Sequence, residues 1–167
     1  MSRSSLRFAL ALAIGMLLAW QAPRAQELPV PVVGHADDVA RLAGVWEGGY
    51  TSDETGRHGT LRFELTAGDA HAVTRLVMVP VATPEDPAPE PVVLTLHLVE
   101  VDSVTVRGVL RPYDDPEWDL PLETHFVGTL GGDGITGAFD SLPTSVDTIP
   151  TSGRWWATRQ RPLAPEL

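Results

Sequence analysis

Strand-like sequence begins with LAGVWEGGY, residues Leu42–Tyr50. After this stretch, apolar residues alternate with polar ones over short segments that Gly, Pro and Asp separate, a pattern typical of antiparallel sandwiches and barrels. The Gly-x-Trp spacing of Gly44–Trp46 returns near the other end of the chain in GRWW, residues Gly153–Trp156. We therefore expect the first and last strands of the domain to meet in a closed sheet.

Eight segments after Leu42 show the strand pattern. In the fourth of them, Leu94, Leu96 and Leu98 should share one face, which predicts a sheet with one buried face and one solvent-exposed face. No stretch after Leu42 has the length and 3.6-residue period of a helix, so the sequence predicts an all-β, eight-stranded, antiparallel up-and-down barrel. A barrel of that size is either filled by side chains or able to hold one small ligand. The expected strands are 45–51, 57–66, 70–81, 92–101, 103–112, 121–130, 134–140 and 152–159.

In the second half of the chain, glycines occur both in a predicted turn and within the predicted strands on either side of it. The segments Phe126–Leu130 and Ile135–Phe139 mirror one another about Gly131–Gly134, where glycine permits the positive φ angles of a tight hairpin. Gly128 and Gly137 interrupt these two strands, as glycines do where a barrel wall bends or another group packs close.

The N-terminal region has the features of an export signal. Arg3 and Arg7 precede an apolar run, Phe8–Trp20, that is too short to cross a bilayer comfortably. We expect a signal peptide over 1–25, an extended leader over 26–36, a barrel domain over 37–160 that opens with a short helical turn, and a tail over 161–167. The protein is then exported, either to the periplasm or to the medium.

The net charge and the absence of cysteine limit the classes of partner and site that the protein can have. The net charge is −10, and loss of the segment through Ala25, with its three arginines and no acid, would make it −13. Such a balance argues against binding to nucleic acid or to anionic membranes. Cysteine is absent, so neither a disulfide nor a thiolate metal site is available. Charged residues expected on the outward faces, among them Arg62 and Arg107, also argue against a barrel that spans a membrane after signal cleavage.

The opening pattern Leu42-x-Gly44-x-Trp46, together with the short helical turn before it, resembles the start of calycin barrels, the group that contains lipocalins, avidins and fatty-acid-binding proteins. The resemblance implies that Trp46 closes one end of the barrel beneath an arginine of the last strand. That arginine would be Arg159 or Arg154. Trp155, on the same strand, is expected near this closed end.

Catalytic chemistry finds little support in the sequence. No Gly-x-Ser-x-Gly elbow, phosphate-binding glycine loop or Ser-x-x-Lys motif occurs, so we expect neither an enzyme nor a cofactor. The acidic stretch 113–119 is expected to be a solvated connection rather than a Ca²⁺ site, with Tyr113 and Trp118 at the rim of the barrel. The histidines show no metal-ligand spacing, so we expect no metal site; they are His35, His58, His71, His97 and His125.

Two hypotheses of function follow. In the first, the barrel binds a small apolar ligand, which would enter at the end opposite Trp46. In the second, a filled barrel acts as a structural or protein-interaction module of the cell envelope. An interior cavity well below the ~300 Å³ typical of ligand pockets would argue against the first hypothesis. The expected ligand-binding wall consists of Leu61, Phe63, Leu96, Leu110, Phe126 and Phe139.

Overall fold

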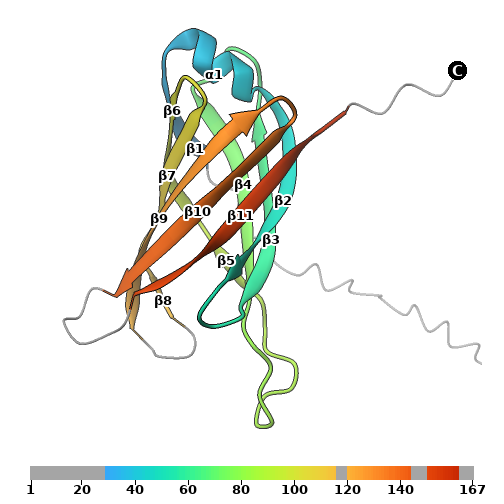
Figure 1. Cartoon of the computed structure of the whole chain (residues 1–167), viewed down its shortest axis with the longest axis vertical. Coiled ribbons are helices and arrows are strands. Elements are labelled where there is room, and N and C mark those ends of the chain that lie inside the picture. The colour runs from blue at the N-terminus through green and yellow to red at the C-terminus, as the bar shows by residue number, and fades with distance from the viewer. Residues whose placement is uncertain (1–28, 116–119, 144–149, 162–167) are drawn as a thin grey trace, which may run out of the picture.

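The computed structural model describes residues 29–115, 120–143 and 150–161, which form a closed β-barrel with one short helix at one end (Figure 1). The expected signal peptide, Trp118 and all but the first residue of the tail lie outside the described residues. Helix α1 is Ala36–Leu42, which confirms the expected helical turn. The strands are β1 Pro29–Gly34, β2 Gly44–Ser52, β3 His58–Leu65, β4 His71–Val79, β5 Val92–Leu94, β6 Leu96–Asp102, β7 Thr105–Leu110, β8 Tyr113–Asp114, β9 Pro121–Gly131, β10 Gly134–Pro143 and β11 Thr151–Gln160.

The expected all-β barrel is confirmed, but the expected number of strands is wrong. Among the described residues nine strands close the wall, while β5 and β8 are short additions that pair with β4 and β9. The ninth wall strand is β1, which lies in the segment expected to be an extended leader. Its Val30 and Val32 are buried, whereas Pro29 and Pro31 are exposed. Prolines disfavour a strand because they cannot donate a ladder hydrogen bond, but these two fall on the same edge of β1 and leave its other edge intact.

Strand β1 fills a gap between β4 and β6 at the α1 end. The C-terminal part of β4 pairs with β5, whereas its N-terminal residues His71–Val73 pair with β1. Residues Val32–Gly34 of β1 then pair with Val99–Val101 of β6 in parallel. The wall is therefore antiparallel except at this one join.

The other wall strands follow the expected up-and-down order. Neighbours in sequence are neighbours in the sheet, and β11 returns to pair with β2, so the first and last segments of the expected series do meet. The tight hairpin is also confirmed, since Gly131 pairs with Gly134 across a turn in which Gly132 has φ 61°. Only glycine adopts such an angle without steric cost.

One expected face is interrupted by a bulge in β6. Leu94 and Leu96 are buried as expected, but the register with β7 shifts between Leu96 and Leu98. Beyond the shift Val99 and Val101 face the core, and Leu98 is only half-buried. A bulge adds one residue to one strand, so the alternation of faces is reset at that point.

The two ends of the barrel differ. Helix α1 covers one end, and we call the opposite end, where the connection 80–91 between β4 and β5 lies, the mouth (Figure 1). Strand β2 runs from the α1 end, at Trp46, toward the mouth, at Ser52. Within the described ranges, no helix has the length and apolar character needed to cross a membrane.

Candidate functional site

The α1 end of the interior is closed by Trp46. Its side chain is fully buried, and its indole Nε1 donates a hydrogen bond to the carbonyl of Leu42 at 2.8 Å. The guanidinium of Arg159 lies over the ring, 4.3 Å from its centroid. Arg159 also donates to the backbone carbonyls of Ala43 and, at 2.7 Å, Arg41, so it ties the end of β11 to the end of α1. Ligand access at this end is blocked.

Of the two arginines that the sequence left open, the one over Trp46 is Arg159. Arg154 is 75% exposed and lies 3.4 Å from the carboxylate of Asp53 near the mouth. The structure also places Trp155 away from Trp46. Trp155 is opposite Tyr50 in the β2–β11 register, whereas Trp46 is opposite Arg159. Trp155 is therefore part of the inner wall of the barrel rather than of its closed end.

Aromatic rings cover inward-facing glycines one or two strands away on the inner wall. A Cβ atom added to Gly128 would lie 2.4 Å from Cζ2 of Trp155, and one added to Gly108 would lie 2.1 Å from Cζ of Phe126. The rings therefore occupy the space that side chains at these positions would need. Trp155 and Phe126 also pack edge to face, with centroids 5.4 Å apart. The aromatic–glycine contacts are Tyr50 with Gly59, Phe126 with Gly108, Phe139 with Gly153, and Trp155 with Gly128 and Gly137.

All six residues expected to form the ligand-binding wall line one interior cavity. The cavity extends from Leu42 and Trp46 at the closed end to Thr55 and Thr151 near the mouth. Its volume is about 110 Å³. This is well below the ~300 Å³ that a drug-sized ligand needs and close to the ~150 Å³ of a cavity that admits benzene. By this measure the size argues against the first hypothesis, and it leaves room only for a molecule of about the size of benzene.

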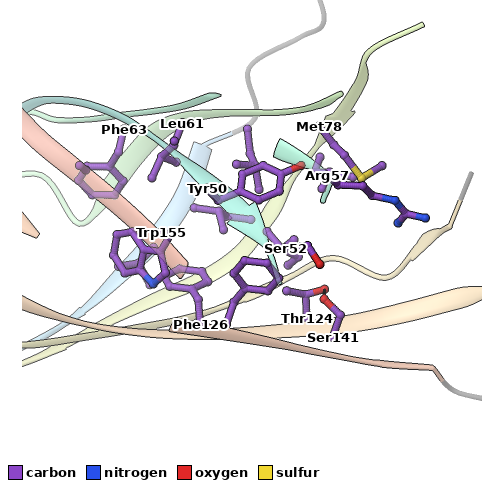
Figure 2. Close-up of a pocket in the computed structure, with 18 of the residues that line it drawn as sticks. Tyr50, Ser52, Arg57, Leu61, Phe63, Met78, Thr124, Phe126, Ser141 and Trp155 are labelled. Atoms are coloured by element: carbon purple, nitrogen blue, oxygen red, sulfur yellow. Dashed lines mark hydrogen bonds between the residues drawn. The ribbon is translucent and has the colours of Figure 1, made fainter. Parts of the chain in front are cut away.

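The half of the cavity nearer the mouth is polar, which the sequence did not predict. Figure 2 shows Thr124 and Ser141 side by side below Ser52, with Tyr50 and Arg57 on the facing side. The hydroxyls of Thr124 and Ser141 are 2.7 Å apart and share a hydrogen bond. The Ser52 hydroxyl donates to the carbonyl of Ser152 at 3.3 Å.

A buried ion pair lies at this polar end. The guanidinium of Arg57 donates to both carboxylate oxygens of Asp115, one of them at 2.8 Å. The side chains are 6% and 0% exposed, respectively. A bidentate pair of this kind satisfies the geometry of both groups and neutralises their charges. The polar end therefore presents hydrogen-bonding groups without a net charge from this pair.

One buried hydroxyl in the described part of the cavity has no hydrogen-bond partner. Among the buried side-chain polar atoms of the described residues, only the Tyr50 hydroxyl and the Nε of Arg159 have no hydrogen-bond partner. The Arg159 Nε nevertheless lies 3.2 Å from the carboxylate of Asp133, so its charge is compensated. The Tyr50 hydroxyl has no such neighbour, and buried polar groups are nearly always paired. It is the group in the cavity that a ligand or a water molecule would satisfy.

Both tyrosines of the chain line this cavity. Burial raises the pKa of Tyr50 far above its ordinary value of 10.0, and the nearby Tyr113 raises it further. Burial also raises the pKa of Tyr113, while hydrogen bonding with Thr124 lowers it. Tyr50 is therefore a neutral phenol at neutral pH, and its hydroxyl can donate a hydrogen bond. Tyr113, expected at the rim, lies inside the mouth and lines the cavity.

Sequence reasoning missed Arg57, Asp115, Thr124 and Ser141 as site residues. Thr124 shares the inward face of β9 with buried Leu122 and Leu130, so its inward direction could have been predicted from the two-residue period of the strand. Arg57 and Asp115 lie outside the regular strands and are 58 residues apart, so no local pattern links them.

The described residues contain no group of three or more His, Asp or Glu side chains that could hold a metal ion. His97 and His125 are exposed on the outside of the wall, and His125 contacts Glu123 at 2.6 Å.

The closed barrel is compatible with the calycin resemblance. No family model matches the chain, and no curated protein or solved structure shows significant similarity to it.

Proposed function

We propose that this protein is an exported binding barrel that takes a small molecule into its interior through the mouth. The observation that carries the proposal is the buried Tyr50 hydroxyl, which faces the cavity and has no partner among the described residues. An unsatisfied buried hydroxyl costs about 1–3 kcal/mol, and a bound ligand would recover this energy.

The form of the cavity supports a binding role. Its closed end is apolar and its open end is polar, the arrangement that fixes the orientation of a small ligand. The cavity is small because aromatic rings on the wall fill the space above the inward-facing glycines. The ligand is then much smaller than the fatty acids and retinoid-sized molecules that a larger barrel would hold.

The alternative is a filled barrel that acts as a structural or protein-interaction module. The volume of about 110 Å³ favours this alternative over a lipid-binding function. In that case a few water molecules would occupy the interior, and the Tyr50 hydroxyl would bind one of them.

Xenon binding distinguishes the two functions without assuming the chemistry of the ligand. Apolar cavities of this size take up xenon, so we expect a saturable shift of the xenon NMR signal in the presence of the protein. Leu61→Phe should abolish the shift because Leu61 lines the cavity. Val127→Phe is the control, since Val127 is exposed on the outside of the wall. An unshifted signal with the native protein would leave the filled barrel as the function.

The export part of the proposal rests on the N-terminal sequence and has a separate test. Cleavage after Ala25 would leave β1, which begins at Pro29, intact in the mature protein. Intact-mass measurement of the protein recovered from the periplasm or medium should give the chain that starts at Gln26. Recovery of the full-length chain from the cytoplasm would contradict export.

A further inference from the structure

We infer that the ligand is an uncharged molecule with a hydrogen-bond acceptor, such as a carbonyl oxygen, at one end of a compact apolar body. This inference rests on the proposed function and specifies the chemistry that the interior selects. It follows from three features of the cavity: its charge balance, the one buried donor without a partner among the described lining residues, and the side chains that surround the rest of the ligand.

The charge balance excludes ionic ligands. Among the described residues that line the cavity, Arg57 is the cation, and Asp115 binds it with both carboxylate oxygens. An anionic ligand would compete with Asp115 for the guanidinium, so its binding would cost the bidentate contact of the buried ion pair. A cationic ligand would face the Arg57 guanidinium, and the described lining of the cavity contains no carboxylate to pair with that ligand. Each would lose its hydration shell without an adequate replacement.

The unsatisfied donor selects an acceptor. The hydroxyls of Thr124 and Ser141 bind each other, and that of Ser52 binds the carbonyl of Ser152. The Tyr50 hydroxyl is left to bind the ligand, and Figure 2 shows it turned toward Met78 and Arg57, at the polar end of the cavity. A phenol at neutral pH is a good donor, so a carbonyl or ether oxygen fits it better than another donor does.

The remaining surface selects an apolar body. Toward the closed end the ligand would contact aromatic and aliphatic side chains, including Phe63, Phe126 and Trp155. These side chains offer no further polar atom for a ligand, because the indole Nε1 of Trp155 already donates to the carbonyls of Val127 and Ala138 at 3.1 and 3.2 Å. A ligand with polar groups at both ends would therefore lose hydrogen bonds to water at its inner end.

A series of ring compounds of similar size tests this chemistry. The probes are cyclopentanone, its hydrocarbon counterpart methylenecyclopentane, the cation cyclopentylammonium and the anion cyclobutanecarboxylate. Affinities are measured by ligand-observed NMR on the mature chain. We expect cyclopentanone to bind about 2- to 12-fold more tightly than methylenecyclopentane, which is the range that one net hydrogen bond provides. The two ions should show no saturable binding.

Tyr50→Phe tests the assigned donor. The variant keeps the ring that packs on Gly59 and removes the hydroxyl, so the preference for the ketone over the hydrocarbon should disappear while the hydrocarbon still binds. Retained hydrocarbon binding also shows that the variant is folded. Val127→Phe is the control, because Val127 is exposed on the outside of the wall, and the preference should persist in this variant.

The outcomes separate this inference from the proposed function. Tighter binding of either ion, or equal binding of the ketone and the hydrocarbon by the native protein, would overturn the neutral-acceptor inference and leave small-molecule binding standing. A ketone preference that survives in Tyr50→Phe would overturn the role of Tyr50. If none of the four compounds binds and xenon also fails to bind, the proposed function itself is wrong.

Discussion

Tyr50 lies directly opposite Gly59 in the β2–β3 register, and a Cβ atom on Gly59 would come within 2.5 Å of Cε1 of the Tyr50 ring. The glycine thus makes room for the ring, and the ring covers backbone that the glycine would leave bare. The same relationship recurs around the inner wall at Gly108, Gly137 and Gly153, and the Trp155 ring extends past Gly137 to cover Gly128 as well. It determines both the positions of the aromatic rings and the small volume left between them.

Gly128 tests this packing. We expect Gly128→Ala to lower the free energy of unfolding by about 1–3 kcal/mol, because the new methyl group would displace the Trp155 ring. The control is Gly131→Ala, also in β9, where an added Cβ meets nothing within 4 Å. Chemical denaturation of both variants measures the difference. Equal stability of the two would show that the ring does not depend on the glycine.

Arg159 should be more important for stability than Arg154. Arg159→Lys removes the planar group that lies on Trp46 and binds two backbone carbonyls, and we expect a loss of about 1–3 kcal/mol. Arg154→Lys should cost less than about 0.5 kcal/mol, since Arg154 is exposed. Thermal unfolding of the two variants gives the comparison, and a larger loss for Arg154→Lys would contradict the assignment of the closed end.

Loss of one member of the Arg57–Asp115 ion pair should lower the free energy of unfolding strongly. Asp115→Asn removes the charged bidentate partner from the buried Arg57 guanidinium, and we expect a loss of about 3–5 kcal/mol. Asp114→Asn alters an adjacent, exposed carboxylate and serves as the control. The double variant Arg57→Met with Asp115→Leu should regain part of the lost stability, because it removes both buried charges of the pair. Equilibrium unfolding in urea measures all three, and a tolerated Asp115→Asn would contradict the pairing.

The tyrosines predict a specific response to high pH. Both have a pKa raised by burial, so folding favours the neutral phenols. Their contribution to stability is complete below the unfolded pKa of 10.0 and is lost as the pH rises above it toward the folded values. The near-ultraviolet absorbance of tyrosinate should therefore not develop near pH 10 in the folded protein, and it should develop there in guanidinium. The chain has only two tyrosines, so the titration of either one near pH 10 in the folded protein would be visible in the absorbance, and it would contradict the prediction.

The sequence predicted the features that depend on local pattern. Alternation located the eight later wall segments, and the glycines of 131–134 located the hairpin. The ninth strand was missed because its burial depends on a gap between β4 and β6, which are distant in sequence, and because its prolines are unfavourable in strands. The bulge at Leu98 was missed for a similar reason, since the shift is defined only against β7.

The candidate site was predicted only in part. The six apolar wall residues could be chosen from the periodicity of their strands, and all six line the cavity. The polar end could not be predicted, because Arg57 and Asp115 meet only when the connections at the mouth fold together. The unsatisfied hydroxyl of Tyr50 is a property of the completed packing, and its position in the opening stretch of the domain gave no sign of it.

The most direct test of the account is a crystal structure of the mature protein with cyclopentanone bound. We expect the ketone inside the barrel, with its oxygen about 2.7 Å from the Tyr50 hydroxyl and its ring toward Phe63 and Trp155. A cavity filled by repacked side chains, or a ketone oxygen that binds elsewhere while Tyr50 remains unpaired, would contradict the account.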